Sequence, residues 1–213
     1  MWAGGLAGLL GLSLVLIGGI GRATADAAAG PADIADKAAL CAACHGQAGI
    51  SGDPATIPII NGQAAAYLMK QLRDYRRGDR DNPVMAEIAR SLDEADLRPL
   101  ARHFGGAPWP APDAAPAASG RPEGGRPEGG WPEGGRPEGG RPAGLDLCEI
   151  CHQPGLRGGL PGPRLAGLDA SYLLAQMNAF ADGRRGNSQD MQRIMQGTGA
   201  EERAAMARYL SGL

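Results

Sequence analysis

The chain has 213 residues, of which 21 are basic and 23 acidic, and its formal net charge is −2. This balance carries no signature of nucleic-acid binding, which is typically marked by a strong excess of Lys and Arg on one face. The four cysteines all lie in two short motifs, so no cysteine is left for a disulfide framework.

The chain begins with an uncharged apolar run, residues 2–21, which contains seven glycines. It is followed by Ala23-Thr24-Ala25, an A-x-A sequence of the kind that precedes signal-peptide cleavage. These features predict a signal peptide over residues 1–25 and export across the cytoplasmic membrane. The alternative is an uncleaved membrane anchor, because the run is near spanning length. The glycines favour cleavage, since they make a poor permanent helix.

Each cysteine motif has the form C-x-x-C-H. The first consists of Cys41, Cys44 and His45, and the second of Cys148, Cys151 and His152. A redox dithiol would need a surrounding pattern of strands, which neither motif has. A zinc site built from all four cysteines would leave both histidines unexplained. Covalent haem attachment uses every member, because the thiols form thioethers and the histidine ligates the iron. The motifs therefore predict two haem c groups.

Periodicity and turn residues predict helices over residues 31–44, 62–78 and 91–106 in the first half of the chain. The second helix should end at Gly78. Ser91 followed by Glu94 predicts a capping box at the start of the third helix. No segment after residue 25 alternates as a strand would, so the predicted fold class is all-α.

Methionine is the candidate for the second axial ligand at each iron. Met85 follows His45 by 40 residues, and Met191 follows His152 by 39. His/Met ligation fills both axial positions and suits electron transfer. Met195 is a rival to Met191, but only Met191 preserves the M-x-x-I pattern of the first motif. Met69 and Met177 lie within helical runs and are interpreted as core residues.

Residues 120–144 contain five copies of a five-residue unit rich in Gly and Pro. Such a segment has little to bury, so residues 106–144 are predicted to be a disordered linker between a first domain, 26–105, and a second, 145–213. With 39 linker residues, the sequence predicts two flexibly tethered domains that do not dock as one rigid body.

The two domains align with each other as an internal duplication. The residues that match in pairs are Pro58 with Pro163, Gly62 with Gly167, Tyr67 with Tyr172, Gln71 with Gln176, Arg80 with Arg185 and Met85 with Met191. Domains this small have a high ratio of surface to volume, and each holds only three aromatic side chains. A haem at the centre would supply the missing apolar body.

Together, the two C-x-x-C-H motifs, the P-x-[IL]-x-G turns, the Y-L-x-x-Q-[LM] helices and the methionine after each G-x-R resemble the dihaem class I cytochromes c of the cytochrome c4 type. The resemblance covers residues 40–105 and 147–211. It implies two cytochrome c folds in one chain, each wrapped around one haem. It also implies that the carbonyl groups of Pro58 and Pro163 accept a hydrogen bond from the proximal histidines.

The function implied is that of a periplasmic electron carrier between respiratory or dehydrogenase complexes and an acceptor such as a terminal oxidase. The chain would not itself be an enzyme, and it would bind neither nucleic acid nor a membrane, except through an uncleaved anchor. One alternative is the dihaem subunit of a flavin-containing dehydrogenase, such as a sulfide dehydrogenase. A dihaem peroxidase fits less well, because it needs an iron that is open to peroxide.

Overall fold

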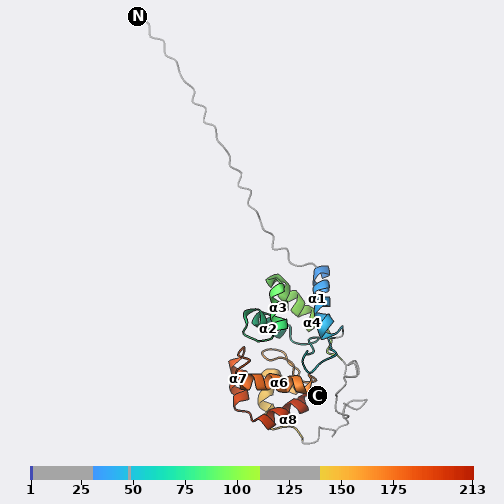
Figure 1. The fold of residues 1–213 in the computed structure, drawn as a ribbon, viewed down its shortest axis with the longest axis vertical. Helices are drawn as coiled ribbons and strands as arrows, with labels where there is room; N and C mark the ends of the chain where they lie inside the picture. The colour runs from blue at the N-terminus through green and yellow to red at the C-terminus, as the bar shows by residue number, and fades with distance from the viewer. Residues whose placement is uncertain (2–30, 48, 111–139) are drawn as a thin grey trace.

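The computed structural model describes residues 1, 31–47, 49–110 and 140–213. The predicted signal peptide and most of the predicted linker, including the GRPEG repeats before residue 140, lie outside the described residues. Two helical domains face each other (Figure 1). Within the described ranges there is no strand, only one isolated bridge between Arg80 and Arg185, which confirms the all-α prediction. No helix in these ranges combines the length and apolar character that a membrane span needs.

The first domain contains four helices. These are α1 (Pro31–His45), α2 (Ala65–Arg77), α3 (Pro83–Ser91) and α4 (Glu94–Gly106). Helix α2 packs against both α3 and α4, and α1 packs against α4. Lys37 of α1 forms an ion pair with Asp96 of α4 at 2.8 Å, and the hydrogen bond to Lys37 lowers the pKa of the Asp96 carboxyl group. This pair links the helix that carries the first C-x-x-C-H motif to the rest of the domain.

The second domain repeats this arrangement. It contains α5 (Leu145–His152), the short 3₁₀ turn η2 (Pro154–Leu156), α6 (Ala170–Ala181), α7 (Gln189–Gln196) and α8 (Ala200–Ser211). Helix α6 packs against α7 and α8, as α2 does against α3 and α4. Its cluster of buried apolar side chains has thirteen members, whereas the corresponding cluster in the first domain has four. The second domain therefore has the larger protein core.

The sequence placed the start of α4 incorrectly. Ser91 was expected to cap this helix, but it is the last residue of the separate helix α3. Asp93 is the N-cap of α4, and the side chain of Asp96 accepts the Asp93 backbone N–H at 3.0 Å. The same spacing of polar residues occurs twice in a short stretch, and only the path of the chain after α3 selects the second. Gly78 does end α2, in the left-handed conformation with φ of 81°.

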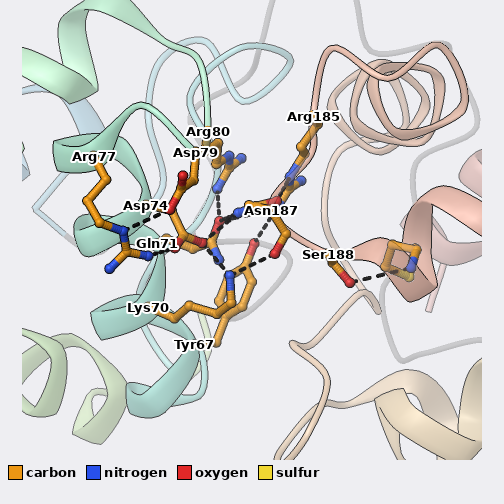
Figure 2. A network of polar contacts seen from close by, with 11 residues as sticks. Tyr67, Lys70, Gln71, Asp74, Arg77, Asp79, Arg80, Arg185, Asn187 and Ser188 are labelled. Atoms are coloured by element: carbon orange, nitrogen blue, oxygen red, sulfur yellow. Dashed lines mark hydrogen bonds and ion pairs between the residues drawn. The ribbon is translucent and has the colours of Figure 1, made fainter.

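The prediction of two flexibly tethered domains is wrong, because the domains dock through a network of buried polar side chains (Figure 2). Arg80 donates to the Tyr172 hydroxyl of the second domain at 3.0 Å, and Arg185 donates to the Tyr67 hydroxyl of the first at 3.2 Å. The length of a linker limits how far apart two domains can move. It does not determine whether complementary surfaces bind each other.

Trp109, which the sequence analysis assigned to the linker, is part of this docked surface. It packs against the buried cluster of the second domain. The Arg164 guanidinium lies 4.1 Å from the centre of its ring, within the range of a cation–π contact. Gly62 and Gly167 lie against Trp109 from the two domains, and a Cβ on Gly62 would come within 2.8 Å of the Trp109 backbone.

Asp74 is the most deeply buried carboxylate of the interface, with its side chain 1% exposed. It accepts hydrogen bonds from Lys70, from Arg77 at 2.8 Å and, across the interface, from the Asn187 amide at 2.7 Å. The duplicate position in the second domain holds Ala179. The interface is therefore polar, and at this position it is not symmetric.

Asp74→Ala should lower the free energy of unfolding of the holoprotein by about 1 to 3 kcal/mol, because it removes several hydrogen bonds to a buried charge. Denaturant titration followed by circular dichroism measures this loss. Asp79→Ala is the matched control: Asp79 is half exposed, and its exposed ion pair with Arg77 should be worth less than about 1 kcal/mol. Equal losses in the two variants would contradict the importance assigned to the Asp74 contacts.

Candidate functional site: two equivalent sets of haem-binding residues

The first set of residues lies at the C-terminal end of α1. Cys41 and Cys44 are one helical turn apart, and their thiols are free. The next residue, His45, is buried, and its Nδ1 lies 2.8 Å from the Pro58 carbonyl oxygen. A carbonyl oxygen can only accept, so Nδ1 carries the proton and Nε2 keeps its lone pair. Burial lowers the pKa of His45, against the opposing effect of this hydrogen bond, which favours the neutral imidazole that can bind a metal.

Gly46 makes the sharp turn after His45 possible. Its N–H donates to the Ala42 carbonyl at 2.9 Å, and its φ of 81° is in the left-handed region. A Cβ at this position would come 1.9 Å from the Ile50 carbonyl oxygen. Only glycine allows the chain to fold back so closely and bring Pro58 to the imidazole.

The second set is built in the same way at the end of α5. Cys148 is partly buried and Cys151 is exposed, and neither forms a disulfide. The Nδ1 of His152 lies 2.7 Å from the Pro163 carbonyl oxygen, so the same tautomer is selected. Burial again lowers the pKa of the histidine. Gly162 makes the close approach possible, because a Cβ there would come 2.9 Å from His152 Nδ1.

The two candidate methionines occupy equivalent positions. Met85 is the third residue of α3. Its backbone N–H donates to the Asn82 side chain at 2.9 Å. Met191 is likewise the third residue of α7, with its N–H 3.4 Å from the Ser188 hydroxyl. Both side chains are partly exposed.

The other methionines of the helices lie differently. Met195, the rival of Met191, is 2% exposed inside the buried cluster of the second domain. Met177 is also buried in that cluster, whereas Met69 is only partly buried on α2. The sulfur of a methionine that is enclosed by the protein core makes packing contacts there and is not free to bind a metal. Met191, and not Met195, therefore corresponds to Met85.

Among the described residues, no group of three or more His, Cys, Asp or Glu side chains could hold a metal ion. The four-cysteine zinc cluster that the sequence left open is therefore not formed there. Each site instead offers one neutral imidazole and two free thiols, and the matched methionine is the candidate for a further donor. This donor set fits a haem iron with covalent attachment of the porphyrin.

A pair of buried cations supports the same fit. Arg80 and Arg185 are each only 7% exposed. Within the described part of the chain, their hydrogen-bond partners are all neutral. These partners are Gln71, Gln176, Asn187, Tyr67 and Tyr172. A buried guanidinium without an anion is costly, and the carboxylate groups of haem could supply that anion.

The potential around these arginines is positive enough to affect a neighbouring hydroxyl group. Burial by itself would raise the pKa of Tyr67, but the nearby Arg185 and Arg80 lower it. Sequence reasoning aligned the arginine pair as part of the duplication without assigning it a role. The sequence feature that could have revealed this role is the recurrence of polar residues at matched positions in both domains. Gln71 matches Gln176, and Arg80 matches Arg185.

No protein-family model matches the chain. It is 34% identical over 212 residues to cytochrome c4 of Pseudomonas aeruginosa, an alignment that covers 96% of this chain and 98% of that protein. It is 38% identical over 155 residues to a thiosulfate dehydrogenase electron acceptor of Thiomonas intermedia, which covers 70% of this chain and 66% of that protein.

Two solved structures are also similar. Reduced recombinant cytochrome c4 from Pseudomonas stutzeri matches with a TM-score of 0.65 and 26% identity, over 87% of this chain and 100% of that one. Thiosulfate dehydrogenase from Marichromatium purpuratum, in its as-isolated form, matches with a TM-score of 0.59 and 33% identity. That match covers 80% of this chain but only 36% of the other.

The near-complete alignment with a relative at 34% identity agrees with the paired C-x-x-C-H sites and the helical fold. The chain belongs to the cytochrome c4 family of dihaem class I cytochromes c, electron-transfer proteins that carry two covalently bound haem c groups and are not themselves enzymes.

Proposed function

We propose that the protein is a periplasmic electron carrier that accepts electrons from a dehydrogenase and delivers them to an acceptor such as a terminal oxidase. The observation that carries this proposal is the equivalence of the two sites. Each has a buried neutral histidine bonded to a proline carbonyl, and each has a methionine at the third position of a helix. Two sites of the same design in docked domains suit the relay of electrons.

In this proposal each residue has a defined task. Cys41 and Cys44 in the first domain, and Cys148 and Cys151 in the second, form the thioethers. His45 and His152 are the proximal ligands, oriented by Pro58 and Pro163. Met85 and Met191 are the distal ligands. When bound, haem supplies one-electron chemistry between ferric and ferrous iron. With one histidine and one methionine assigned to each iron, the protein would leave no open position for peroxide, so a peroxidase activity is not proposed.

The donor that we favour is a thiosulfate dehydrogenase. Two relatives are named as electron acceptors of that enzyme, and part of a solved thiosulfate dehydrogenase has the same fold. Stopped-flow mixing of the oxidised protein with such a dehydrogenase and thiosulfate tests this pairing. Both haems should be reduced within the turnover time of the enzyme. Reduction no faster than with thiosulfate alone would contradict the pairing.

The second candidate is a subunit of a flavin-containing dehydrogenase, such as a sulfide dehydrogenase. Purification from native cells separates the two candidates: a stable complex with a flavoprotein favours the subunit, and a free dihaem protein favours the carrier. The periplasmic location rests on the predicted signal peptide and on the haem c chemistry. N-terminal sequencing of the mature protein, expected to begin at Asp26, tests whether the apolar segment is removed.

The methionine assignment predicts a spectroscopic result. A Met–Fe(III) pair gives a weak charge-transfer band at about 695 nm, so Met85→Ala and Met191→Ala should each remove about half of this band. The measurement is the absorption spectrum of each oxidised holoprotein. Met195→Ala is the control, because Met195 belongs to the core and its loss should lower stability while both ligands remain. If Met195→Ala removed the second half of the band and Met191→Ala did not, the assignment would be wrong.

The small protein core of the first domain predicts that it needs its haem to fold. Only four buried residues form its cluster, so Cys41→Ala with Cys44→Ala should leave it sensitive to proteolysis. Limited proteolysis with mass spectrometry identifies which domain is cut. The matched variant, Cys148→Ala with Cys151→Ala, should be cut more slowly in the second domain, where the cluster has thirteen members. Equal resistance of both variants and the parent protein would contradict this dependence.

A further inference from the structure

Gln63 connects the two domains at a point next to the second histidine. It lies two residues before the start of α2 and is 3% exposed. Its Oε1 accepts the backbone N–H of Arg164 at 2.7 Å, and its Nε2 donates to the Arg164 carbonyl at 3.0 Å. One side-chain amide of the first domain thus forms hydrogen bonds with both the N–H and the carbonyl of Arg164 in the second domain.

The orientation of this amide follows from its partners. Oε1 faces two N–H groups, those of Arg164 and of Ala64, while Nε2 faces a carbonyl oxygen. Reversing the amide would set its NH₂ group against two donors and its oxygen against an acceptor. Arg164 is held on its other side by the ring of Trp109, which also belongs to the first half of the chain.

Gln63 accepts a hydrogen bond from the Pro163–Arg164 peptide group, and the carbonyl of the same peptide group orients His152. The N–H of Arg164 and the carbonyl of Pro163 belong to the same peptide unit. The N–H donates to Gln63 at 2.7 Å, while the carbonyl accepts from His152 Nδ1 at 2.7 Å. Hydrogen bonds in such a chain polarise one another, so the bond to Gln63 makes the Pro163 oxygen a stronger acceptor. A stronger acceptor at Nδ1 makes the imidazole a more basic ligand.

The first domain has no such chain. Its equivalent peptide joins Pro58 to Ile59, and among the described residues the Ile59 N–H donates no hydrogen bond. Ile59 packs instead against the buried cluster of the second domain. The duplicate of Gln63 is Leu168, which is itself part of that cluster and cannot accept a hydrogen bond. The two histidines therefore differ in what supports their carbonyl acceptors.

We propose that Gln63 is a positioning residue that acts across the domain interface, through the Pro163–Arg164 peptide and His152, to lower the reduction potential of the second iron. A more basic imidazole stabilises ferric iron relative to ferrous iron. Docking of the first domain thereby sets the potential of the second site. Since coupling is reciprocal, oxidation of the second iron strengthens docking and reduction weakens it.

The test measures the two potentials by spectroelectrochemical titration of the full-length holoprotein. Gln63→Leu, which copies the residue at the duplicate position, should shift the reduction equilibrium of the second haem toward ferrous iron by about two- to fivefold. That change corresponds to about 20 to 40 mV upward at about 59 mV per tenfold for one electron. The first haem should shift by less than half as much. In the reduced protein, the His152 Nδ1–H resonance should move upfield in the NMR spectrum.

Two further variants separate this effect from loss of docking. Gln63→Glu keeps an acceptor for the Arg164 N–H, loses the donor to the Arg164 carbonyl and adds negative charge, so the second potential should stay level or fall. Lys70→Met removes a different contact across the interface, to the Asn187 carbonyl, together with the Lys70–Asp74 ion pair, and should leave the second potential within the error of the parent. A rise in Gln63→Glu, equal rises in Gln63→Leu and Lys70→Met, or no shift of the second potential in Gln63→Leu would each overturn the proposal. None of these outcomes bears on whether the protein is an electron carrier.

Discussion

The hydrogen bond between each buried histidine and a proline carbonyl is the constraint on which both sites depend. A carbonyl can only accept, so the bond fixes the tautomer, leaves Nε2 free and holds the ring in one orientation. The loop geometry around it serves this contact. Gly46 and Gly162 stand where any side chain would collide with the turn or with the imidazole. Mobile loops could not hold the acceptor within 2.7 to 2.8 Å of the ring.

Duplication explains why two such sites exist, and docking explains why they need not be alike. The matched arginines, glutamines and tyrosines form a nearly symmetric interface, in which each arginine reaches a tyrosine hydroxyl of the other domain. Asp74 and Gln63 break the symmetry, because their duplicates are Ala179 and Leu168. A carrier with two unequal sites can give the electron a preferred direction, which two identical sites could not.

The polar side chains of the interface are buried without losing their hydrogen bonds. Its side chains satisfy one another, and among the described residues no buried side-chain nitrogen or oxygen lacks a hydrogen-bond partner. The two arginines pack their planar groups on Tyr75 and Phe180, at 4.7 and 4.3 Å from the ring centres. Among the described residues, the side chains that accept hydrogen bonds from the two guanidinium groups are all neutral. The carboxylates of haem would be suitable counter-ions for these guanidinium groups, which would connect cofactor attachment to docking.

The sequence by itself determined the chemistry and the secondary structure. A C-x-x-C-H motif is local, so its haem-attaching residues could be read directly, and the duplication made Met85 and Met191 the candidate ligands by their matched offsets. The three helices expected in the first half were found, but Ser91 ends α3 and does not begin α4. This error arose because several polar residues nearby could cap a helix.

Only the tertiary structure decided that the domains dock, and through which side chains. Gln63 and Asn187 have no local signature, since a polar residue in a turn is expected to be solvated. Their roles appear only when Arg164 and Asp74, which lie more than 100 residues away along the chain, are brought into contact. The long Gly- and Pro-rich segment suggested freedom of movement because its composition has nothing to bury. The composition of a linker indicates whether the linker itself folds. The affinity between the two domains is set by their facing surfaces, which form only when both domains have folded.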